Sequence, residues 1–203
     1  MITLRSAWSQ RGVYGLVGGL LWLAGAAPVR AGEVGVSEEI QVPILLKLLT
    51  YDRTLMSDPP ERIEIAVVYA RGSGPSLRNR DAVLRSLASH HEKTISGIPF
   101  RVHSLAFESA GRLVEDLRRE QIHVVYVTAG HEDNFDAIRH ATQEVGALSI
   151  TGAAGFVARG LSVGVEVSND KPRIQVNLGS LKAERHELKS SVLRLCDIVG
   201  GRP

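Results

Sequence analysis

Small and hydroxyl-bearing residues gather in three short segments of the sequence, RGSGPS at 71–76, TAGHED at 128–133 and TGAAG at 151–155. Backbone N–H groups of such residues can hold an anion where a loop leads into a helix. We therefore predict that an anion or a small ligand could bind there, at Gly72, Ser73, Gly74, Ser76, Thr128, Gly130, His131, Thr151 and Gly152. The alternative is that these segments are structural turns, which are rich in glycine and serine for geometric reasons alone. Leu77 stands where a dinucleotide-binding fingerprint would need its third glycine.

The histidines do not form a recognisable metal site. A zinc site needs several nitrogen or sulfur ligands at spacings that bring them together, whereas the adjacent His90 and His91 point in different directions on a helix. His131, Glu132 and Asp133 could supply one or two ligands, but nothing nearby completes a set. We expect no bound metal and no cofactor, and we expect His123, inside an apolar strand, to be a hydrogen-bonded core residue.

Catalytic residues are also not indicated. Ser73, between two glycines, is the one serine whose loop context would suit a nucleophile, and Gly-Ser-Gly is equally typical of a plain turn. The lone Cys196 falls in an apolar helical register, which is typical of a small buried side chain and leaves a reactive or intermolecular thiol as the alternative. With one cysteine the chain cannot form an intrachain disulfide. We predict that the protein is not an enzyme.

The elements that must position these residues alternate between strands and helices. Apolar, β-branched runs predict strands at 63–70, 100–107, 122–128 and 147–151, with helices between them that begin near Asn79, Ser109 and Asp133 or Asn134. After residue 160 the period changes to two, which predicts an antiparallel hairpin of 161–168 and 173–179. Ser180 is expected to cap a last helix that runs to 199. Strand–helix alternation predicts a single α/β domain with a mostly parallel, flavodoxin-like, doubly wound sheet, a C-terminal hairpin and a closing helix.

The first 31 residues have the pattern of a secretory signal peptide. Arg5 and Arg11 precede an uncharged run at 13–27, and Val29 and Ala31 place small side chains before a cleavage point. The run is too short to span a bilayer core of about 30 Å. We predict a signal peptide at 1–31, a polar lead-in at 32–42 and the α/β domain at 43–200. The mature chain is expected outside the membrane, in the periplasm, with secretion as the alternative.

Charge argues against a nucleic-acid partner. The signal segment contributes three arginines and no acid, so the other 172 residues hold 21 basic and 22 acidic side chains. Mixed-sign runs such as KAERHELK at 182–189 are expected to be solvated faces. A nearly neutral domain without a basic patch does not suit a phosphate backbone.

Two predicted helices, 43–56 and 180–199, carry more apolar residues than one contact with a sheet needs. In the first helix, Lys47, Asp52 and Arg53 fall on the polar side. An uncovered apolar face on these helices would bind a partner protein, and its candidate residues are Leu45, Leu48, Leu49, Leu188, Val192 and Leu195. The alternative is that these residues pack in the core.

The sequence resembles the YfiR-like family of bacterial periplasmic proteins over roughly residues 40 to 200. The resemblance rests on ILLKLLTYDRTL, IEIAVVYA, IHVVYVTAG, ALSITG and the C-terminal segment GLSVGVEVSNDKPRIQVNLGSLKAERHELKSSVLRLCDIV. It implies a regulatory protein: the best-known member restrains an inner-membrane diguanylate cyclase through its periplasmic sensor region, and so tunes cyclic-di-GMP signalling and biofilm formation. The implied partner is a membrane sensor such as a diguanylate cyclase or histidine kinase, with a homodimer as a further option. Members of that kind look disulfide-stabilised, whereas this chain has one cysteine.

Overall fold

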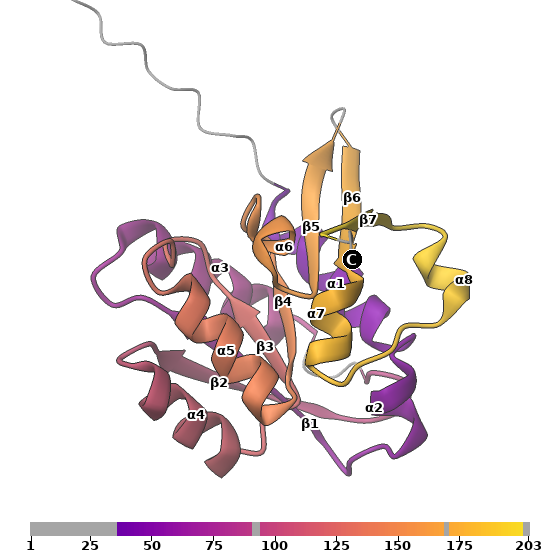
Figure 1. The fold of residues 1–203 in the computed structure, drawn as a ribbon, viewed down its shortest axis with the longest axis horizontal. Helices are drawn as coiled ribbons and strands as arrows, with labels where there is room; N and C mark the ends of the chain where they lie inside the picture. Colours follow the sequence, from indigo (N-terminus) through magenta and orange to yellow (C-terminus); the bar gives the residue numbers. More distant parts are fainter. Residues whose placement is uncertain (1–35, 91–93, 169–170, 201–203) are drawn as a thin grey trace, which may run out of the picture. The chain divides into compact units, whose positions relative to one another are not determined.

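The sheet contains seven strands in the order β2-β1-β3-β4-β5-β6-β7. They are seen in a computed structural model that describes residues 36–90, 94–168 and 171–200, and their bounds are β1 Ile63–Tyr69, β2 Phe100–Ala106, β3 Val124–Val127, β4 Leu148–Thr151, β5 Val163–Ser168, β6 Lys171–Asn177 and β7 Asp197–Val199. The first five strands are parallel, β6 runs antiparallel to β5, and β7 is parallel to β6 (Figure 1). The order 2-1-3-4-5 of the parallel strands is that of flavodoxin-like folds, which confirms the predicted fold class.

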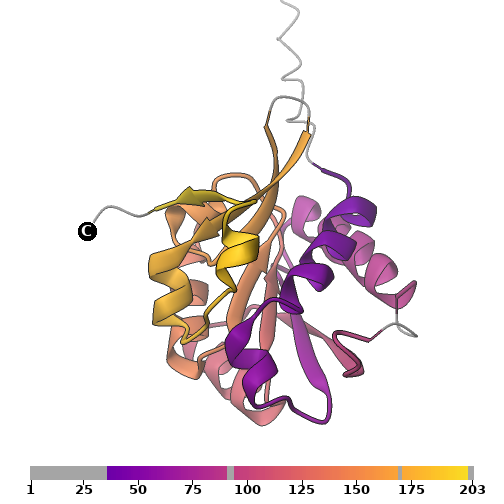
Figure 2. The ribbon, with the colours of Figure 1, turned by 90° about the vertical axis from the view of Figure 1, so that its right-hand side faces the viewer.

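Helices cover both faces of this sheet. Their bounds are α1 Glu38–Leu49, α2 Arg53–Ser57, α3 Gly74–Ala88, α4 Ala110–Arg119, α5 Phe135–Val145, α6 Phe156–Arg159, α7 Leu178–Ala183 and α8 Ser190–Leu193. Residues of α1, α3 and α8 pack into the core of one face, and residues of α4, α5 and α6 into the core of the other. Figure 2 shows the first face, with α1 lying across the strands.

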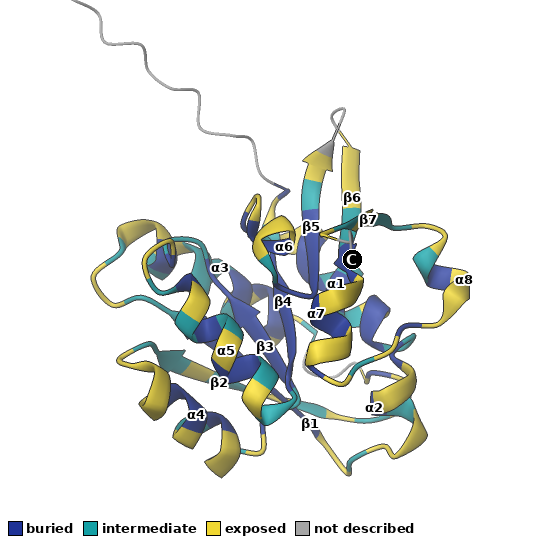
Figure 3. Ribbon diagram, in the orientation of Figure 1, coloured by how far each residue is buried: buried dark blue, intermediate teal, exposed yellow. Residues whose placement is uncertain are grey.

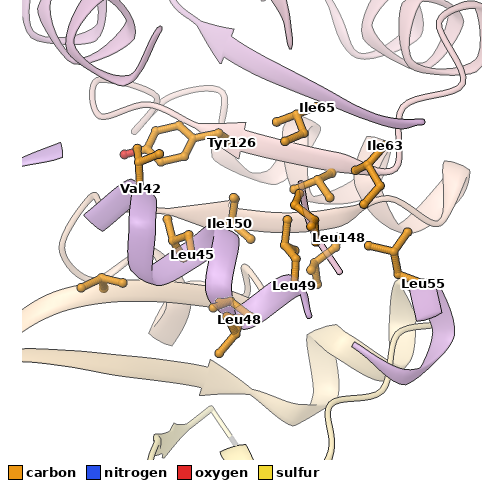
Figure 4. Packing of buried hydrophobic residues seen from close by; sticks show 14 of the residues in the cluster. Val42, Leu45, Leu48, Leu49, Leu55, Ile63, Ile65, Tyr126, Leu148 and Ile150 are labelled. Atoms are coloured by element: carbon orange, nitrogen blue, oxygen red, sulfur yellow. The ribbon is translucent and has the colours of Figure 1, made fainter. Parts of the chain in front are cut away.

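The two cores follow from the period of the strands. Ile63, Ile65 and Val67 of β1 point to the α1 face, whereas Ala66 and Val68 point to the α4–α5 face, because successive strand side chains alternate. Both sets are buried, so the central strands carry apolar residues at nearly every position (Figure 3). Figure 4 shows the leucines of α1 packed against side chains of the sheet.

The first helix begins earlier than predicted. It starts at Glu38 and contains Pro43 in its interior, whereas the prediction placed the helix start at Pro43. Five residues of the predicted polar lead-in are therefore helical, and among them Gln41 and Val42 are buried. The helix ends at Leu49, and the short α2 then begins after Asp52, whose carboxylate accepts from the backbone N–H groups of Thr54 and Leu55.

The predicted C-terminal helix over 180–199 is wrong. The segment contains α7, α8 and the edge strand β7, and Asn177 rather than Ser180 caps α7. Arg185 adopts a left-handed conformation with φ 64°, which ends helical geometry after α7. Asp197–Val199 then pairs with Gln175–Asn177 of β6. The spacing of apolar residues favoured a helix, but residues 197–199 are extended and form backbone hydrogen bonds with the edge of β6, which a helix cannot do.

The structure also tests the predicted helix starts and the predicted hairpin. Ser109 accepts from the N–H of Arg112 and caps α4, as predicted. Helix α3 begins at Gly74 with Ser73 as its cap, earlier than the expected start at Asn79. The hairpin of β5 and β6 is confirmed. The predicted signal peptide lies outside the described residues.

Candidate functional site

The carboxyl ends of β1 and β3 bring five of the predicted ligand-binding residues together. The Ser76 hydroxyl accepts from the Ala70 N–H at 2.8 Å and lies 2.6 Å from the Thr128 hydroxyl. Thr128 in turn donates to the Val68 carbonyl at 3.1 Å, so Ser76 donates to Thr128. Both hydroxyls are buried and satisfied within the chain.

The loop after β3 packs closely on the first turn of α3. Gly130 has φ +81°, and a Cβ placed on it would meet the Ser73 hydroxyl at 2.2 Å. Ser73 itself accepts from the Ser76 N–H at 3.3 Å. Asn79, predicted only as a helix cap, accepts from the Ala129 N–H at 3.1 Å and donates to Glu38 at 2.7 Å. This bridge joins α3, the loop after β3, and α1, and local spacing gave no signal for it.

His131 is fully buried beside these hydroxyls. Its Nε2 donates to the Val68 carbonyl at 3.3 Å, its Nδ1 has no hydrogen-bond partner, and its ring meets Phe107 edge-on. Burial lowers the pKa of His131, an effect larger than the opposing pull of the Val68 carbonyl and the Glu132 charge. The side chain is therefore held as a neutral core residue, away from solvent.

The remaining predicted ligand-binding residues do not join that cluster through any described hydrogen bond. Thr151 donates to the Val127 carbonyl and accepts from the Ala153 N–H. Beside it, Gly152 leaves room for the buried amide of Gln41, which would lie 1.8 Å from a Cβ at that position. Gln41 accepts from the Tyr126 hydroxyl at 3.2 Å. Gly72 and Gly74 are exposed. The polar groups of these loops thus form hydrogen bonds within the chain, which favours the interpretation as structural turns over that of a ligand-binding site.

A Gly-x-Ser-x-Gly spacing does occur in the chain, at 160–164. It is not a nucleophile elbow, because Ser162 leads into β5 instead of turning from a strand into a helix. Its hydroxyl is buried and donates to Glu184. Glu184 is also buried and accepts from the Thr142 hydroxyl at 2.7 Å and the Ser149 N–H at 2.9 Å. These contacts fix α7 against α5, β4 and β5.

A polar cluster that the sequence did not reveal lies at the opposite end of the sheet. Glu64 of β1 accepts from Arg62 at 2.8 Å and lies 2.7 Å from His103 Nε2. Burial would raise the pKa of Glu64, but the hydrogen bonds from His103 and Arg62 lower it overall. His123 accepts from the Glu64 N–H at 3.1 Å, which confirms the predicted hydrogen bond, but it precedes β3 and is half-buried, which corrects its placement in the core. Among the described residues, no three His, Cys, Asp or Glu side chains form a set that could hold a metal ion.

Most of the predicted partner-binding residues are buried. Leu45, Leu48, Leu49, Leu188 and Val192 are each at most 6% exposed and belong to the core, which corrects the prediction of an uncovered helix face for these five. They are buried because α1 and the segment around α8 cover the sheet themselves. The sixth residue, Leu195, is 72% exposed.

An apolar hollow lies beside Leu195. It has a volume of about 520 Å³ and is formed between α1, β6 and α8, with Pro43, Ile44, Lys47, Leu48, Tyr51, Ile174, Ser191, Val192 and Leu195 as its lining. We call this hollow the α1–α8 groove. Lys47 is the charged residue of this lining. A more polar hollow on the other side of α1, of about 630 Å³, shares Pro43, Lys47 and Tyr51 and adds Lys189.

The YfiR/HmsC-like family matches residues 57–197, more than half of the chain. The chain belongs to this family. The match is narrower than the resemblance over residues 40 to 200, and it includes α8, Leu195 and all strands except the last two residues of β7. Membership in the YfiR/HmsC-like family supports a periplasmic regulatory protein. None of the helices in the described part of the chain is long and apolar enough to cross a membrane.

Solved structures support the fold of this YfiR/HmsC-like chain. A conserved domain protein from Vibrio cholerae aligns with a TM-score of 0.58 and 12% identity over 82% of this chain and 61% of that one. An ABC domain in complex with L-Trp from Streptococcus pneumoniae aligns with a TM-score of 0.51 and 12% identity over 80% of this chain and 60% of that one. A substrate-binding protein with adhesive properties from Clostridium difficile, in its ligand-free open form, aligns with a TM-score of 0.52 and 17% identity over 73% of this chain and 58% of that one. The chain thus spans about three fifths of the length of each. No curated protein matches the sequence significantly.

Proposed function

We propose that this protein is a periplasmic regulator that binds the periplasmic region of an inner-membrane sensor, such as a diguanylate cyclase or a histidine kinase, through the α1–α8 groove. The observation that carries the proposal is the exposure of Leu195 at the rim of an apolar hollow. Exposed apolar surface of this kind is costly in water unless a partner covers it. The family supports a regulatory role without catalysis.

The lining of the groove defines the chemistry of the partner segment. Its walls are apolar, and Lys47 supplies a positive charge on the ridge between the two hollows. Lys189 adds a second positive charge on the other side of α1. An apolar anchor residue followed by a carboxylate would complement this surface, since opposite charges at the rim steer association and the buried apolar contact supplies affinity.

A single exposed side chain tests this proposal. The mature protein, its Leu195→Asp variant and its Leu178→Asp variant are cross-linked in solubilised inner membranes, and captured proteins are identified by mass spectrometry. Leu178 is the matched control because it is 43% exposed on α7 and does not line the groove. We expect the wild type and Leu178→Asp to capture the same membrane sensor and Leu195→Asp to capture about tenfold less, as for loss of one interface anchor.

The result that would overturn the proposal is equally specific. Equal capture by Leu195→Asp and the wild type would remove the groove from the interface, and no membrane sensor in any sample would remove the partner. The competing ligand-sensor hypothesis predicts the second result together with a higher melting temperature in a screen of anions and small metabolites. Both variants should unfold within about 0.5 kcal/mol of the wild type, because both sites are exposed.

A further inference from the structure

The segment between α7 and α8 is joined to the junction of α1 and α2 by a short ladder. The Arg53 N–H donates to the Glu187 carbonyl at 2.7 Å, and the Lys189 N–H donates to the Tyr51 carbonyl at 3.0 Å. Asp52 and Leu188 form the antiparallel bridge between these two bonds. The ladder brings residues about 135 positions apart in the sequence side by side.

A buried ion pair closes this ladder. His186 Nδ1 lies 2.5 Å from Asp52 Oδ2, and the two side chains are 7% and 0% exposed. The other carboxylate oxygen, Oδ1, already accepts from the N–H groups of Thr54 and Leu55. Asp52 thus contacts the backbone of α2 through one oxygen and the His186 ring through the other.

The second ring nitrogen of His186 also faces an acceptor. Nε2 lies 3.3 Å from the Gly146 carbonyl at the end of α5. A neutral imidazole has one N–H and one lone pair, so it would direct a lone pair at either the Asp52 carboxylate or the Gly146 carbonyl. The doubly protonated ring donates to both acceptors, and the geometry therefore favours a positive charge on His186.

The surrounding charges act on this ring in both directions. Burial would lower the pKa of His186, but the Asp52 hydrogen bond and charge, the Gly146 carbonyl and the Glu184 charge raise it overall. His123, the residue before β3, lies close enough that the His186 charge lowers the pKa of His123 further below the value set by burial. Asp58 and Arg185 line the same hollow as His123 and His186. The nearby Arg53–Glu187 pair is 60% and 65% exposed and is screened by water.

The ladder leads directly into the α1–α8 groove. Tyr51, which accepts from Lys189, lines the groove, and Lys189 is the residue before the first turn of α8. Helix α8 then places Val192 in the core and leads to the exposed Leu195. With only four residues, α8 has little stability of its own and depends on these contacts.

The geometry points to a pH-sensitive latch: protonated His186 holds the segment that carries α8 against α1, and loss of this proton releases α8 and opens the groove wall. The effect on a sensor partner rests on the proposed function, whereas the latch is a property of the chain alone. Because the pKa of His186 is raised, the stability it contributes is complete below the ordinary value of 6.5 and is lost as the pH rises through the higher folded-state value.

The single cysteine reports on the latch without a partner. Cys196 follows α8, is half-buried and donates to the Val192 carbonyl at 3.2 Å. Thiol labelling rates are compared between the mature wild type and His186→Gln at each pH from about 6 to about 9, so that intrinsic thiol reactivity cancels. We expect the wild type to label about tenfold more slowly at the acidic end, as for one charge-assisted hydrogen bond, and the two rates to converge at the alkaline end.

His140→Gln is the matched control, because His140 is exposed on α5. It should label like the wild type throughout. A ratio of wild-type to His186→Gln rates that does not change with pH would overturn the latch. If His186→Gln does not fold, the wild-type rate relative to a free thiol, with the NMR titration of the His186 ring, decides instead: a flat normalised rate overturns the inference. Failure of the proposed function appears elsewhere, as equal capture by Leu195→Asp.

Discussion

The pKa values of two buried histidines, His186 and His131, are shifted in opposite directions. Against the effect of burial, the Asp52 hydrogen bond and charge raise the pKa of His186, whereas burial lowers the pKa of His131. The cause is the set of partners: His186 has an acceptor at each nitrogen, and His131 has one acceptor and one unpartnered nitrogen. Local sequence did not separate these two residues, because each is set by contacts with distant strands and helices.

We predict that His131→Gln reduces the acid sensitivity of the fold. Because its pKa is lowered, the stability that neutral His131 contributes is present above the ordinary value of 6.5 and is lost as the pH falls below it. Urea unfolding near pH 7.5 and near pH 5 should show a loss of free energy in the variant that is roughly 1 kcal/mol smaller than in the wild type. The exposed His140→Gln should retain the full loss. An unchanged loss in His131→Gln would show that other groups cause it.

The buried carboxylate of Glu184 allows a second prediction. Glu184→Ala leaves the Ser149 N–H and the Ser162 hydroxyl without their acceptor, while the Thr142 hydroxyl keeps the Arg139 carbonyl, and we expect the free energy of unfolding to fall by about 3 kcal/mol. Glu187→Ala, three residues along, removes only the exposed pair with Arg53 and should change it by less than about 0.5 kcal/mol. Equal effects in chemical denaturation would mean that the buried network contributes no net stability.

Two glycines of the predicted ligand-binding loops differ in backbone conformation and in the space around them. Gly130 has a left-handed φ and packs on Ser73 and Ser76, whereas Gly72 has open space around it. We predict that Gly130→Ala lowers the free energy of unfolding by about 2–4 kcal/mol, since it adds backbone strain to a steric overlap. Gly72→Ala should be nearly neutral. The measurement is thermal or urea unfolding, and a neutral Gly130→Ala would show that the loop can move away from α3.

The C-terminal elements show how a sheet edge can override spacing. Leu188, Val192, Leu195 and Val199 recur at helical intervals, yet the structure buries the first two and places Val199 in β7. The charged run at 182–189 was expected to be solvated, but Glu184, His186 and Leu188 turn inward within it. Without β7, strand β6 would be the edge of the sheet and its outer backbone N–H and C=O groups would lack strand partners. Strand β7 supplies these hydrogen-bond partners.

At the scale of the whole molecule, export makes a prediction that needs no structure. Both tryptophans, Trp8 and Trp22, lie in the predicted signal peptide. The exported, cleaved protein should therefore show tyrosine emission only, whereas the uncleaved precursor should show a tryptophan band. Intrinsic fluorescence of protein recovered from the periplasm is the measurement. Tryptophan emission from that sample would mean that the segment is retained.

The arrangement of the strands places two of the three predicted loops where a flavodoxin-like fold would bind a ligand, at the carboxyl ends of β1 and β3, and the third follows β4. The family and the filled loop cluster favour contact with another protein instead. Under the proposed function, regulation by contact needs an accessible surface, and the α1–α8 groove is such a surface.

The βα alternation, the hairpin and the apolar strands could be predicted from the sequence, because they depend on periodicity and on turn residues that are close along the chain. The family could be recognised from the longer motifs that the sequence shares with it. The strand order, the burial of five of the six candidate partner residues, the split of the last helix and the pairing of Asp52 with His186 became visible in the three-dimensional structure alone. Asp52 had been expected on a polar helix face, and His186 in a solvated run. Each of these outcomes depends on contacts between residues far apart in sequence, where the sheet edges and the two cores compete for the same side chains.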